Sequence, residues 1–343
     1  MNLLASVPAL SALLLVVVAV VLQQSAAVAA TGVTLLNVSY DVTREFYRDF
    51  NTAFIAHWKE KTGETITVNQ SHGGSSKQAR SVIDGLPADV VTMNQSLDID
   101  ILHERAKLIL QDWAARLPNQ SVPYNSTILF IVHKGNPKTI KDWPDLVRPG
   151  VSVVIPNPKT SGNGRYSYLA AWGYALKKNG GDEAKAREFV AKLFANVPVL
   201  DTGGRGATTT FAQRGIGDAL LTFENEGALT LRELGGGDLE VVIPSVSILA
   251  ENPVVWVDRV VKKHGTEKVA QAYLQYLWSD VGQELAAKHN FRPQNKTILA
   301  RNAGRFKAID LFTVDEVAGS WPKAQQVHFV DGGLFDKIYQ PQK

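Results

Sequence analysis

Three short segments of this 343-residue sequence place glycines and hydroxyl side chains directly before a predicted helix. They are residues 70–77 (QSHGGSSK), 158–165 (PKTSGNGR) and 201–208 (DTGGRGAT). The first backbone N–H groups of a helix have no partner within it, and the aligned peptide dipoles leave a partial positive charge beside them. Glycine lets a ligand approach the backbone closely, and Ser and Thr add hydroxyl donors. The pattern is therefore typical of a site that holds an oxyanion by hydrogen bonds.

Ordinary helix caps and turns have the same composition, and for a single segment that is the simpler interpretation. Three such segments in one chain favour binding, and a fourth polar segment, residues 39–43 (SYDVT), precedes another predicted helix. Their spacing matches neither a Walker phosphate loop nor a dinucleotide-binding fingerprint. Arg165 and Arg205 follow the glycines in two segments. They either add positive potential or pair with nearby carboxylates.

The elements that must position these segments alternate between short apolar strands and amphipathic helices. Strands are predicted at residues 33–40, 65–69, 88–93, 126–132, 151–155, 219–223, 240–244 and 254–257. Helices are predicted at residues 44–61, 77–86, 166–179, 184–195, 208–214, 267–279 and 281–288. This alternation predicts an α/β architecture in which each glycine-containing segment connects a strand to a helix.

Several longer sequence segments resemble the corresponding segments of the bacterial sulfate- and thiosulfate-binding proteins of sulfur-uptake ABC transporters. The matching segments are residues 36–41, 70–77, 157–162 with Arg165, 169–173, 201–211, 215–218 and 248–251. The resemblance covers about residues 33–339 and implies a two-lobed, type II periplasmic binding protein fold with the ligand in the cleft between the lobes. It implies a discontinuous lobe 1 of residues 30–115 and 247–343, and a lobe 2 of residues 116–246.

The same resemblance assigns ligand-binding positions, mostly through backbone N–H groups at helix starts. The positions are Asp41, Ser75, Ser161 (through its hydroxyl), Gly162, Asn163 and Gly204, with Phe223 at a further ligand position of the family; Arg205 is a candidate from its place after the glycines. Sulfate-specific members carry a Trp donor where this chain has Phe223, and Phe has no donor to offer. Phe223, residues 203–205 and residues 93–95 look more like the thiosulfate-binding branch, so the expected ligand is sulfate, thiosulfate or both.

Composition excludes several other classes of protein. The net charge is +3, from 36 basic and 33 acidic residues that are scattered along the chain, so a nucleic-acid binder is not expected. There is no cysteine, which excludes disulfides, thiolate metal sites, thiol nucleophiles and a bacterial lipid anchor at a cysteine. The seven histidines have no metal-binding spacing. We therefore expect no metal and no cofactor.

The N-terminal residues predict export. Residues 3–22 are almost wholly apolar, and Ala27-Val28-Ala29 offers a cleavage site of the A-x-A kind. This favours a signal peptide of residues 1–29 and a periplasmic location, with an uncleaved anchor as the alternative.

Other functions stay open alongside the expected one. A phosphate site would use a carboxylate such as Asp41, Glu224 or Glu226 to accept the remaining phosphate proton, although these groups fit helix capping or pairing with Arg better. Molybdate differs from sulfate mainly in size. A sulfate-ester-processing enzyme would use His72 with the adjacent Ser71 or Ser75, but no nucleophile elbow is present. A structural or adhesion role is disfavoured by the lack of repeats. We expect a monomeric, non-enzymatic binding protein that delivers its anion to the permease subunits of an ABC importer.

Overall fold

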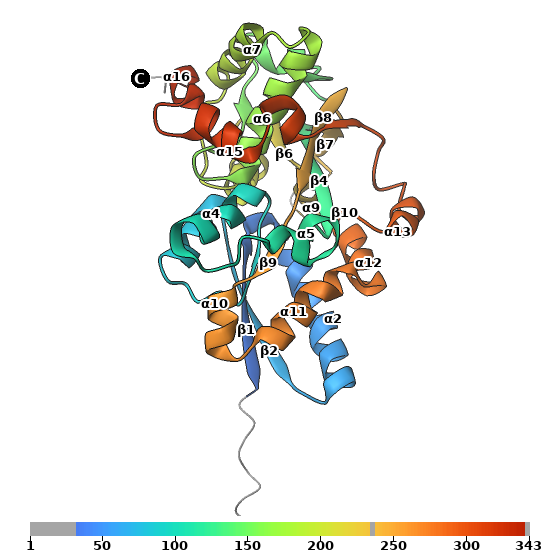
Figure 1. Cartoon of the computed structure of the whole chain (residues 1–343). Helices are drawn as coiled ribbons and strands as arrows, with labels where there is room; N and C mark the ends of the chain where they lie inside the picture. Colours follow the sequence, from blue (N-terminus) through green and yellow to red (C-terminus); the bar gives the residue numbers. More distant parts are fainter. Residues whose placement is uncertain (1–31, 234–236, 340–343) are drawn as a thin grey trace, which may run out of the picture. The chain divides into compact units, whose positions relative to one another are not determined.

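The computed structural model describes residues 32–233 and 237–339, which contain two β-sheets and the helices that cover them (Figure 1). The chain divides after Val33 into a short N-terminal unit, almost all of it outside the described residues, and a unit that begins at Thr34 and holds the elements discussed below. The predicted signal peptide lies outside the described residues. Within the described ranges, no helix combines the length and apolar character needed to cross a membrane.

The first sheet has four strands in the order β2-β1-β3-β9. They are β1 (Val33–Tyr40), β2 (Ile66–Gly73), β3 (Val90–Thr92) and β9 (Val254–Trp256). β1 and β3 run parallel with Val38 opposite Val91, and β9 pairs with β3 in the antiparallel sense. The carboxyl ends of β1 and β3 therefore meet at one edge of the sheet, the edge where ligands bind in open α/β sheets.

The helices around this sheet come from two separate parts of the chain, residues 44–106 and residues 258–288. They are α2 (Arg44–Thr62), α3 (Ser75–Ile83), α4 (Ser96–Ala106), α10 (Asp258–His264), α11 (Glu267–Gln275), η6 (Tyr276–Trp278) and α12 (Asp280–Lys288). α2 shows why the sequence is helical here: Phe46, Phe50, Phe54 and Trp58 recur every four residues and are buried on one face. Gly63 ends α2 with φ of 77° and donates its N–H to Lys59 O, as a left-handed C-cap does.

The second sheet has seven strands, with the path β11-β8-β4-β6-β5 and with β7 and β10 also paired to β4. They are β4 (Tyr124–His133), β5 (Val153–Val154), β6 (Ala219–Phe223), β7 (Leu239–Val242), β8 (Val246–Glu251), β10 (Arg292–Pro293) and β11 (Asp310–Phe312). β4 changes partners along its length: residues 125–127 pair with β8, and residues 128–133 pair with β6 and β7.

A second set of helices packs around this sheet. It includes α6 (Gly162–Lys178), α7 (Glu183–Ala195), α8 (Gly204–Thr208), η5 (Thr209–Gln213), α9 (Glu224–Glu233), α14 (Val314–Ala318), α15 (Trp321–Ala324), η7 (Gln325–Phe329) and α16 (Leu334–Ile338). α14 packs on α6, and α16 packs on α7. The remaining short elements are η2 (Asp41–Thr43), η3 (Trp113–Arg116), α5 (Pro118–Ser121), η4 (Trp143–Val147) and α13 (Lys296–Arg301).

Three helix starts differ from the sequence-based expectation. α3 begins at Ser75, α6 at Gly162 and α8 at Gly204, each about two to four residues before the predicted start at 77, 166 or 208. Glycine and serine score poorly as helix formers, but the first turn tolerates them because its N–H groups need caps or ligands rather than packed side chains. Ser75, Gly162, Asn163, Gly204 and Arg205 therefore lie in the first turn of these helices, where the free N–H groups are.

The predicted lobe boundaries stay a prediction. The chain passes from the first sheet to the second between β3 and β4, returns to the first between β8 and β9, and enters the second again between β9 and β10. β8 and β11 belong to the second sheet, although residues 247–251 and 310–312 were placed in the predicted lobe 1.

Candidate functional site

The starts of α3 and α6 meet the loop before α8. A Cβ on Gly74, the residue before α3, would lie 2.7 Å from the carbonyl oxygen of Thr160 and 3.0 Å from that of Thr202. The hydroxyl of Thr160 also donates to the carbonyl oxygen of Thr202 at 3.0 Å. The three glycine-containing segments, far apart in sequence, are therefore in contact.

The start of α8 also meets the end of β1. The carboxylate of Asp41 accepts the backbone N–H of Arg205 at 3.1 Å, so Asp41 caps α8 from another part of the chain. A Cβ on Gly204 would lie 3.0 Å from Nδ2 of Asn163 and 3.1 Å from a methyl carbon of Val42. A Cβ on Gly203 would overlap the Asp41 carboxylate. Glycine at both positions lets these side chains come this close to the backbone at the start of α8.

The free N–H groups of these helix starts make the region electropositive. The first helical hydrogen bonds are donated by Gln78 to Gly74 O in α3, by Arg165 to Ser161 O in α6 and by Ala207 to Gly203 O in α8. N–H groups before these donors have no acceptor in their own helix. Among them are the N–H groups of Ser75, Ser76, Gly162, Asn163 and Gly204, which are buried residues; the exposed fractions of Ser75, Ser76 and Asn163 are 1–4%. This arrangement can hold an anion away from bulk water.

Two further predicted residues border the same region. Ser161 is the N-cap of α6, and its hydroxyl oxygen accepts the N–H of Gly164 at 3.4 Å. Phe223 is fully buried, with its ring centroid 6.1 Å from that of Tyr40 and 5.7 Å from that of Tyr166. Ser161 has a donor hydrogen left for a ligand, whereas the ring of Phe223 has no donor and a role for it in binding stays a prediction.

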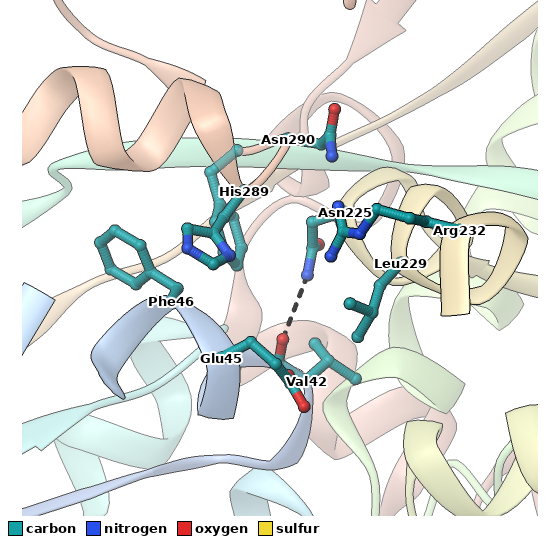
Figure 2. Close-up of a pocket in the computed structure, with 9 residues that line it drawn as sticks. Val42, Glu45, Phe46, Asn225, Leu229, Arg232, His289 and Asn290 are labelled. Atoms are coloured by element: carbon teal, nitrogen blue, oxygen red, sulfur yellow. Dashed lines mark hydrogen bonds between the residues drawn. The ribbon is translucent and has the colours of Figure 1, made fainter. Parts of the chain in front are cut away.

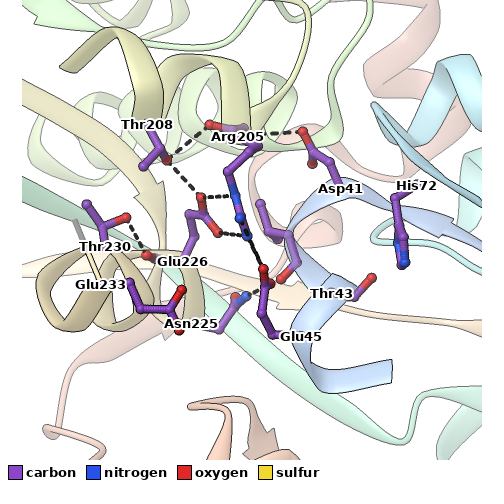
Figure 3. Close-up of polar contacts among 12 residues, drawn as sticks. Asp41, Thr43, Glu45, His72, Arg205, Thr208, Asn225, Glu226, Thr230 and Glu233 are labelled. Atoms are coloured by element: carbon purple, nitrogen blue, oxygen red, sulfur yellow. Dashed lines mark hydrogen bonds and ion pairs between the residues drawn. The ribbon is translucent and has the colours of Figure 1, made fainter. Parts of the chain in front are cut away.

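The side chain of Arg205 is engaged by carboxylates (Figure 3). Its guanidinium donates to both oxygens of Glu45 at 3.2 and 3.0 Å, and to both oxygens of Glu226 at 2.9 and 3.2 Å. The hydroxyl of Thr208 donates to Glu226 at 2.9 Å. A ligand contact by Arg205 stays a prediction, because its guanidinium donors already have carboxylate partners.

Burial sets the charges of this network. Burial raises the pKa of Glu226 to about 7, although the positive charge of Arg205 opposes the rise. Burial also raises the pKa of Asp41 against the hydrogen bond from Arg205 N–H. Burial also favours a raised pKa for Glu45, but the hydrogen bonds and positive charge of Arg205 outweigh burial there. The pKa of Glu45 is therefore lowered. The positive charge of Arg205 is thus balanced within the protein.

The carboxylates that were candidates for accepting a phosphate proton have partners in the chain. Asp41 caps α8, Glu226 binds Arg205, and Glu224 receives two hydrogen bonds from Arg292 at 2.6 and 2.9 Å. The interpretation of these groups as caps and partners of Arg is therefore confirmed. Arg165 differs, because its Nε donates to Pro158 O at 2.9 Å and its guanidinium lies 5.3 Å from the Phe329 ring centroid.

His72 does not pair with the serines beside it in sequence. Its Nδ1 lies 2.6 Å from the hydroxyl of Ser39, and its Nε2 lies 2.6 Å from Oε1 of Gln70. The hydroxyl of Ser71 instead accepts from Gln78, and that of Ser75 donates to the sulfur of Met93. Burial lowers the pKa of His72 to about 4, so the ring is neutral near pH 7. Neither Ser71 nor Ser75 is hydrogen-bonded to His72, as a nucleophile activated by that histidine would be.

A small pocket lies beside the converging helix starts rather than among them. Val42, Glu45, Phe46, Arg232 and His289 are among its lining residues (Figure 2). Phe46 and His289 face it with rings 5.9 Å apart, and it contains none of the three glycine-containing segments. In the described part of the chain, no group of three or more His, Asp or Glu side chains gathers in a way that could hold a metal ion.

The sequence analysis did not identify Asn94 as a side chain that lies beside the converging helix starts. Asn94 follows β3, and a Cβ on Gly162 would overlap its carboxamide. The signal was a polar residue directly after a buried apolar strand, at the sheet edge where ligands bind.

Comparison with known proteins identifies the relatives of the chain. Residues 43–292 match the model of the bacterial extracellular solute-binding protein family. A thiosulfate-binding protein of Pseudomonas aeruginosa is 62% identical over 307 residues, which is 90% of this chain and 92% of the relative. A sulfate-binding protein of Escherichia coli is 54% identical over 314 residues, which is 92% of this chain and 95% of the relative.

Solved structures agree with the predicted fold class. The sulfate-binding protein SubI from Mycobacterium tuberculosis superposes with a TM-score of 0.78 at 30% identity, covering 85% of this chain and 98% of SubI. A periplasmic thiamin-binding protein superposes with a TM-score of 0.67 at 17% identity, which speaks for the fold alone. The α/β, type II periplasmic binding protein fold expected from the sequence is confirmed.

Proposed function

This chain belongs to the bacterial extracellular solute-binding protein family, and from that premise we propose that it binds sulfate or thiosulfate for an ABC importer. It is a binding protein rather than an enzyme. The observation that carries the proposal is the contact of three helix starts, α3, α6 and α8, with the segment after β1. Backbone N–H groups and hydroxyls surround one buried region, and a tetrahedral dianion can accept hydrogen bonds from all of them.

The proposed ligand set follows from this contact. Donors are the N–H groups of Asp41, Ser75, Gly162, Asn163 and Gly204 with the hydroxyl of Ser161, while Phe223 bounds the site and Arg205 supports α8. Sulfate and thiosulfate carry no proton at neutral pH, so a site of donors satisfies them. Hydrogen phosphate would leave its proton without an acceptor, because the nearby carboxylates already have partners in the chain.

Location and delivery complete the proposed function. We propose that residues 1–29 direct export to the periplasm, where the mature protein acts as a monomer. Hinge bending between the two lobes would enclose the anion and exclude water, which strengthens each donor contact. Permease subunits in the membrane would recognise the closed form and release the anion by reopening it.

Titration of the purified, ligand-stripped mature protein tests the proposal. Isothermal calorimetry with sulfate, thiosulfate, molybdate and phosphate should give saturable 1:1 binding of sulfate or thiosulfate and far weaker binding of phosphate. Tight binding of phosphate or molybdate alone would exclude the proposed ligand. Release of product from a sulfate ester would show an enzyme instead.

A further inference from the structure

The carboxamide of Asn94 is buried without a full set of hydrogen bonds. Its side chain is 2% exposed, and its Oδ1 has no hydrogen-bond partner among the described residues. Nearly all buried polar groups in folded proteins have partners, and an exception beside a set of free backbone N–H groups is a candidate for contact with the ligand of those groups. The amide of Asn163 gives the contrast, since its Nδ2 donates to Thr222 at 3.0 Å and its Oδ1 accepts from Ser167 at 3.2 Å.

Asn94 lies between two of the converging helix starts. Its neighbours in sequence contact α3: the sulfur of Met93 accepts from the Ser75 hydroxyl at 3.5 Å, and Gln95 Nε2 donates to the Ser76 hydroxyl at 3.2 Å. Asn94 itself contacts the start of α6, where Oδ1, Cγ and Nδ2 all lie close to the position that a Cβ on Gly162 would take. The carboxamide therefore lies broadside against the backbone of Gly162.

We propose that Asn94 donates a side-chain N–H hydrogen bond to the bound anion, and this inference rests on the proposed function. A dianion offers no proton to Oδ1, so it is Nδ2 that must face the ligand. The two ends of a carboxamide exchange places by a 180° rotation about Cβ–Cγ, which moves no other atom of the protein. Asn94 is thus a contact side chain that comes from a strand end, in addition to the donors of the helix starts.

Two substitutions measure this contact by calorimetry with sulfate and with thiosulfate. Asn94→Ala removes the donor and should weaken binding of at least one of the anions by roughly tenfold to a hundredfold, as expected for a hydrogen bond to a charged group. Asn94→Asp keeps the shape but puts a negative charge beside the anion, and should weaken binding further. Its affinity should recover as the pH is lowered, because the new carboxyl becomes neutral while sulfate stays dianionic. A role in packing alone would not produce this pH dependence.

Asn51→Ala is the matched control. Asn51 is a buried amide of α2 whose Nδ2 has no partner among the described residues, while its Oδ1 accepts from Tyr273 at 2.6 Å. It lies outside the glycine-containing segments, so this variant should lose stability but bind both anions with wild-type affinity.

The outcomes separate this inference from the proposed function. If the wild-type protein binds and a folded Asn94→Ala variant binds both anions equally well, the role of Asn94 is refuted and the proposed function stands. If the wild-type protein binds neither anion, both are refuted. Should neither variant fold, NMR of the wild-type protein decides: the side-chain amide signals of Asn94 must shift on sulfate addition, and unchanged signals refute the contact.

Discussion

At the scale of single residues, the hydroxyl of Ser161 can serve two partners at once. Its oxygen accepts the N–H of Gly164 at 3.4 Å as the cap of α6, and its hydrogen is free to donate to an anion. Ser161→Ala should weaken sulfate binding by about tenfold to a hundredfold and lower the free energy of unfolding by about 1 kcal/mol. Calorimetry and urea denaturation measure the two effects.

Ser279→Ala is the control for that prediction. Ser279 caps α12 in the same way, accepting the N–H of Gly282 at 3.1 Å, but it lies outside the proposed site. The Ser279→Ala variant should lose a similar free energy of unfolding and keep the wild-type affinity for sulfate. Equal affinity losses in the two variants would mean that Ser161 acts only through the helix.

Phe223 governs the expected preference between the two anions. Phe223→Trp introduces an indole N–H donor and should raise the ratio of sulfate to thiosulfate affinity, since a sulfur atom is a poorer acceptor than the oxygen it replaces. The ring is packed against Tyr40 and Tyr166, so overpacking should cost about 1–3 kcal/mol of stability. An unchanged affinity ratio in a folded variant would refute this role.

Glu226 should make stability depend on pH. Its pKa is about 7 in the folded protein against an ordinary value of 4.5, so the folded state favours the protonated form. Its contribution is then fully present below pH of about 4.5 and is lost as the pH rises through about 7. The free energy of unfolding of the wild type relative to Glu226→Gln should fall by roughly 2–3 kcal/mol across that window. Urea denaturation at several pH values checks this, and a difference that grows with pH would contradict it.

At the scale of elements, the close approach of helix starts should be sensitive to one methyl group. A Cβ at Gly74 would lie 2.7 Å from Thr160 O and 3.0 Å from Thr202 O, both backbone atoms that cannot move independently. Gly74→Ala should therefore separate α3 from the other two helix starts. Anion binding should weaken by at least about tenfold, because several N–H donors would no longer point at the anion.

Gly304→Ala provides the comparison for Gly74→Ala. A Cβ at Gly304 would meet no atom within 4 Å, so this variant should keep wild-type affinity by calorimetry. Full affinity in Gly74→Ala as well would show that the contact between the three segments does not matter for binding.

At the scale of the whole molecule, Arg205 connects helices that pack on different sheets. α8 packs on β6 of the second sheet, while α2 packs on β2 of the first, and Arg205 on α8 pairs with Glu45 on α2. The proposed hinge closure would bring helices α2 and α8 together. Glu45→Gln should therefore weaken sulfate binding by about threefold to tenfold, because a partly exposed ion pair contributes about 1 kcal/mol.

Glu284→Gln is the control for that effect. Glu284 pairs with Arg301 at 2.5 Å in an exposed ion pair between α12 and α13, away from the converging helix starts. Its loss should leave affinity unchanged. Small-angle scattering adds a second measurement: the wild type should become more compact on sulfate addition, and Glu45→Gln should need more sulfate for the same change.

Much of the site follows from local chemistry that the sequence displays directly. Glycine and serine before a helix predict free N–H groups, and alternation of strand and helix predicts the α/β fold. Long apolar periods such as that of α2 locate its helix almost to the residue. Strand β8 and helices α4 and α9 escaped prediction because their polarity pattern is mixed, and tertiary packing decides such segments.

Partners far apart in sequence were decided only by the tertiary structure. The glycines and serines of the three segments indicated free N–H groups near a helix start, although the predicted starts at residues 77, 166 and 208 lie two to four residues after the true ones at Ser75, Gly162 and Gly204. The sequence did not determine that Asp41 would cap α8, that Arg205 would be neutralised by Glu45 and Glu226, or that Asn94 would lie against Gly162. Such contacts join residues about 20 to 160 positions apart, and only the packing of the tertiary structure brings them together.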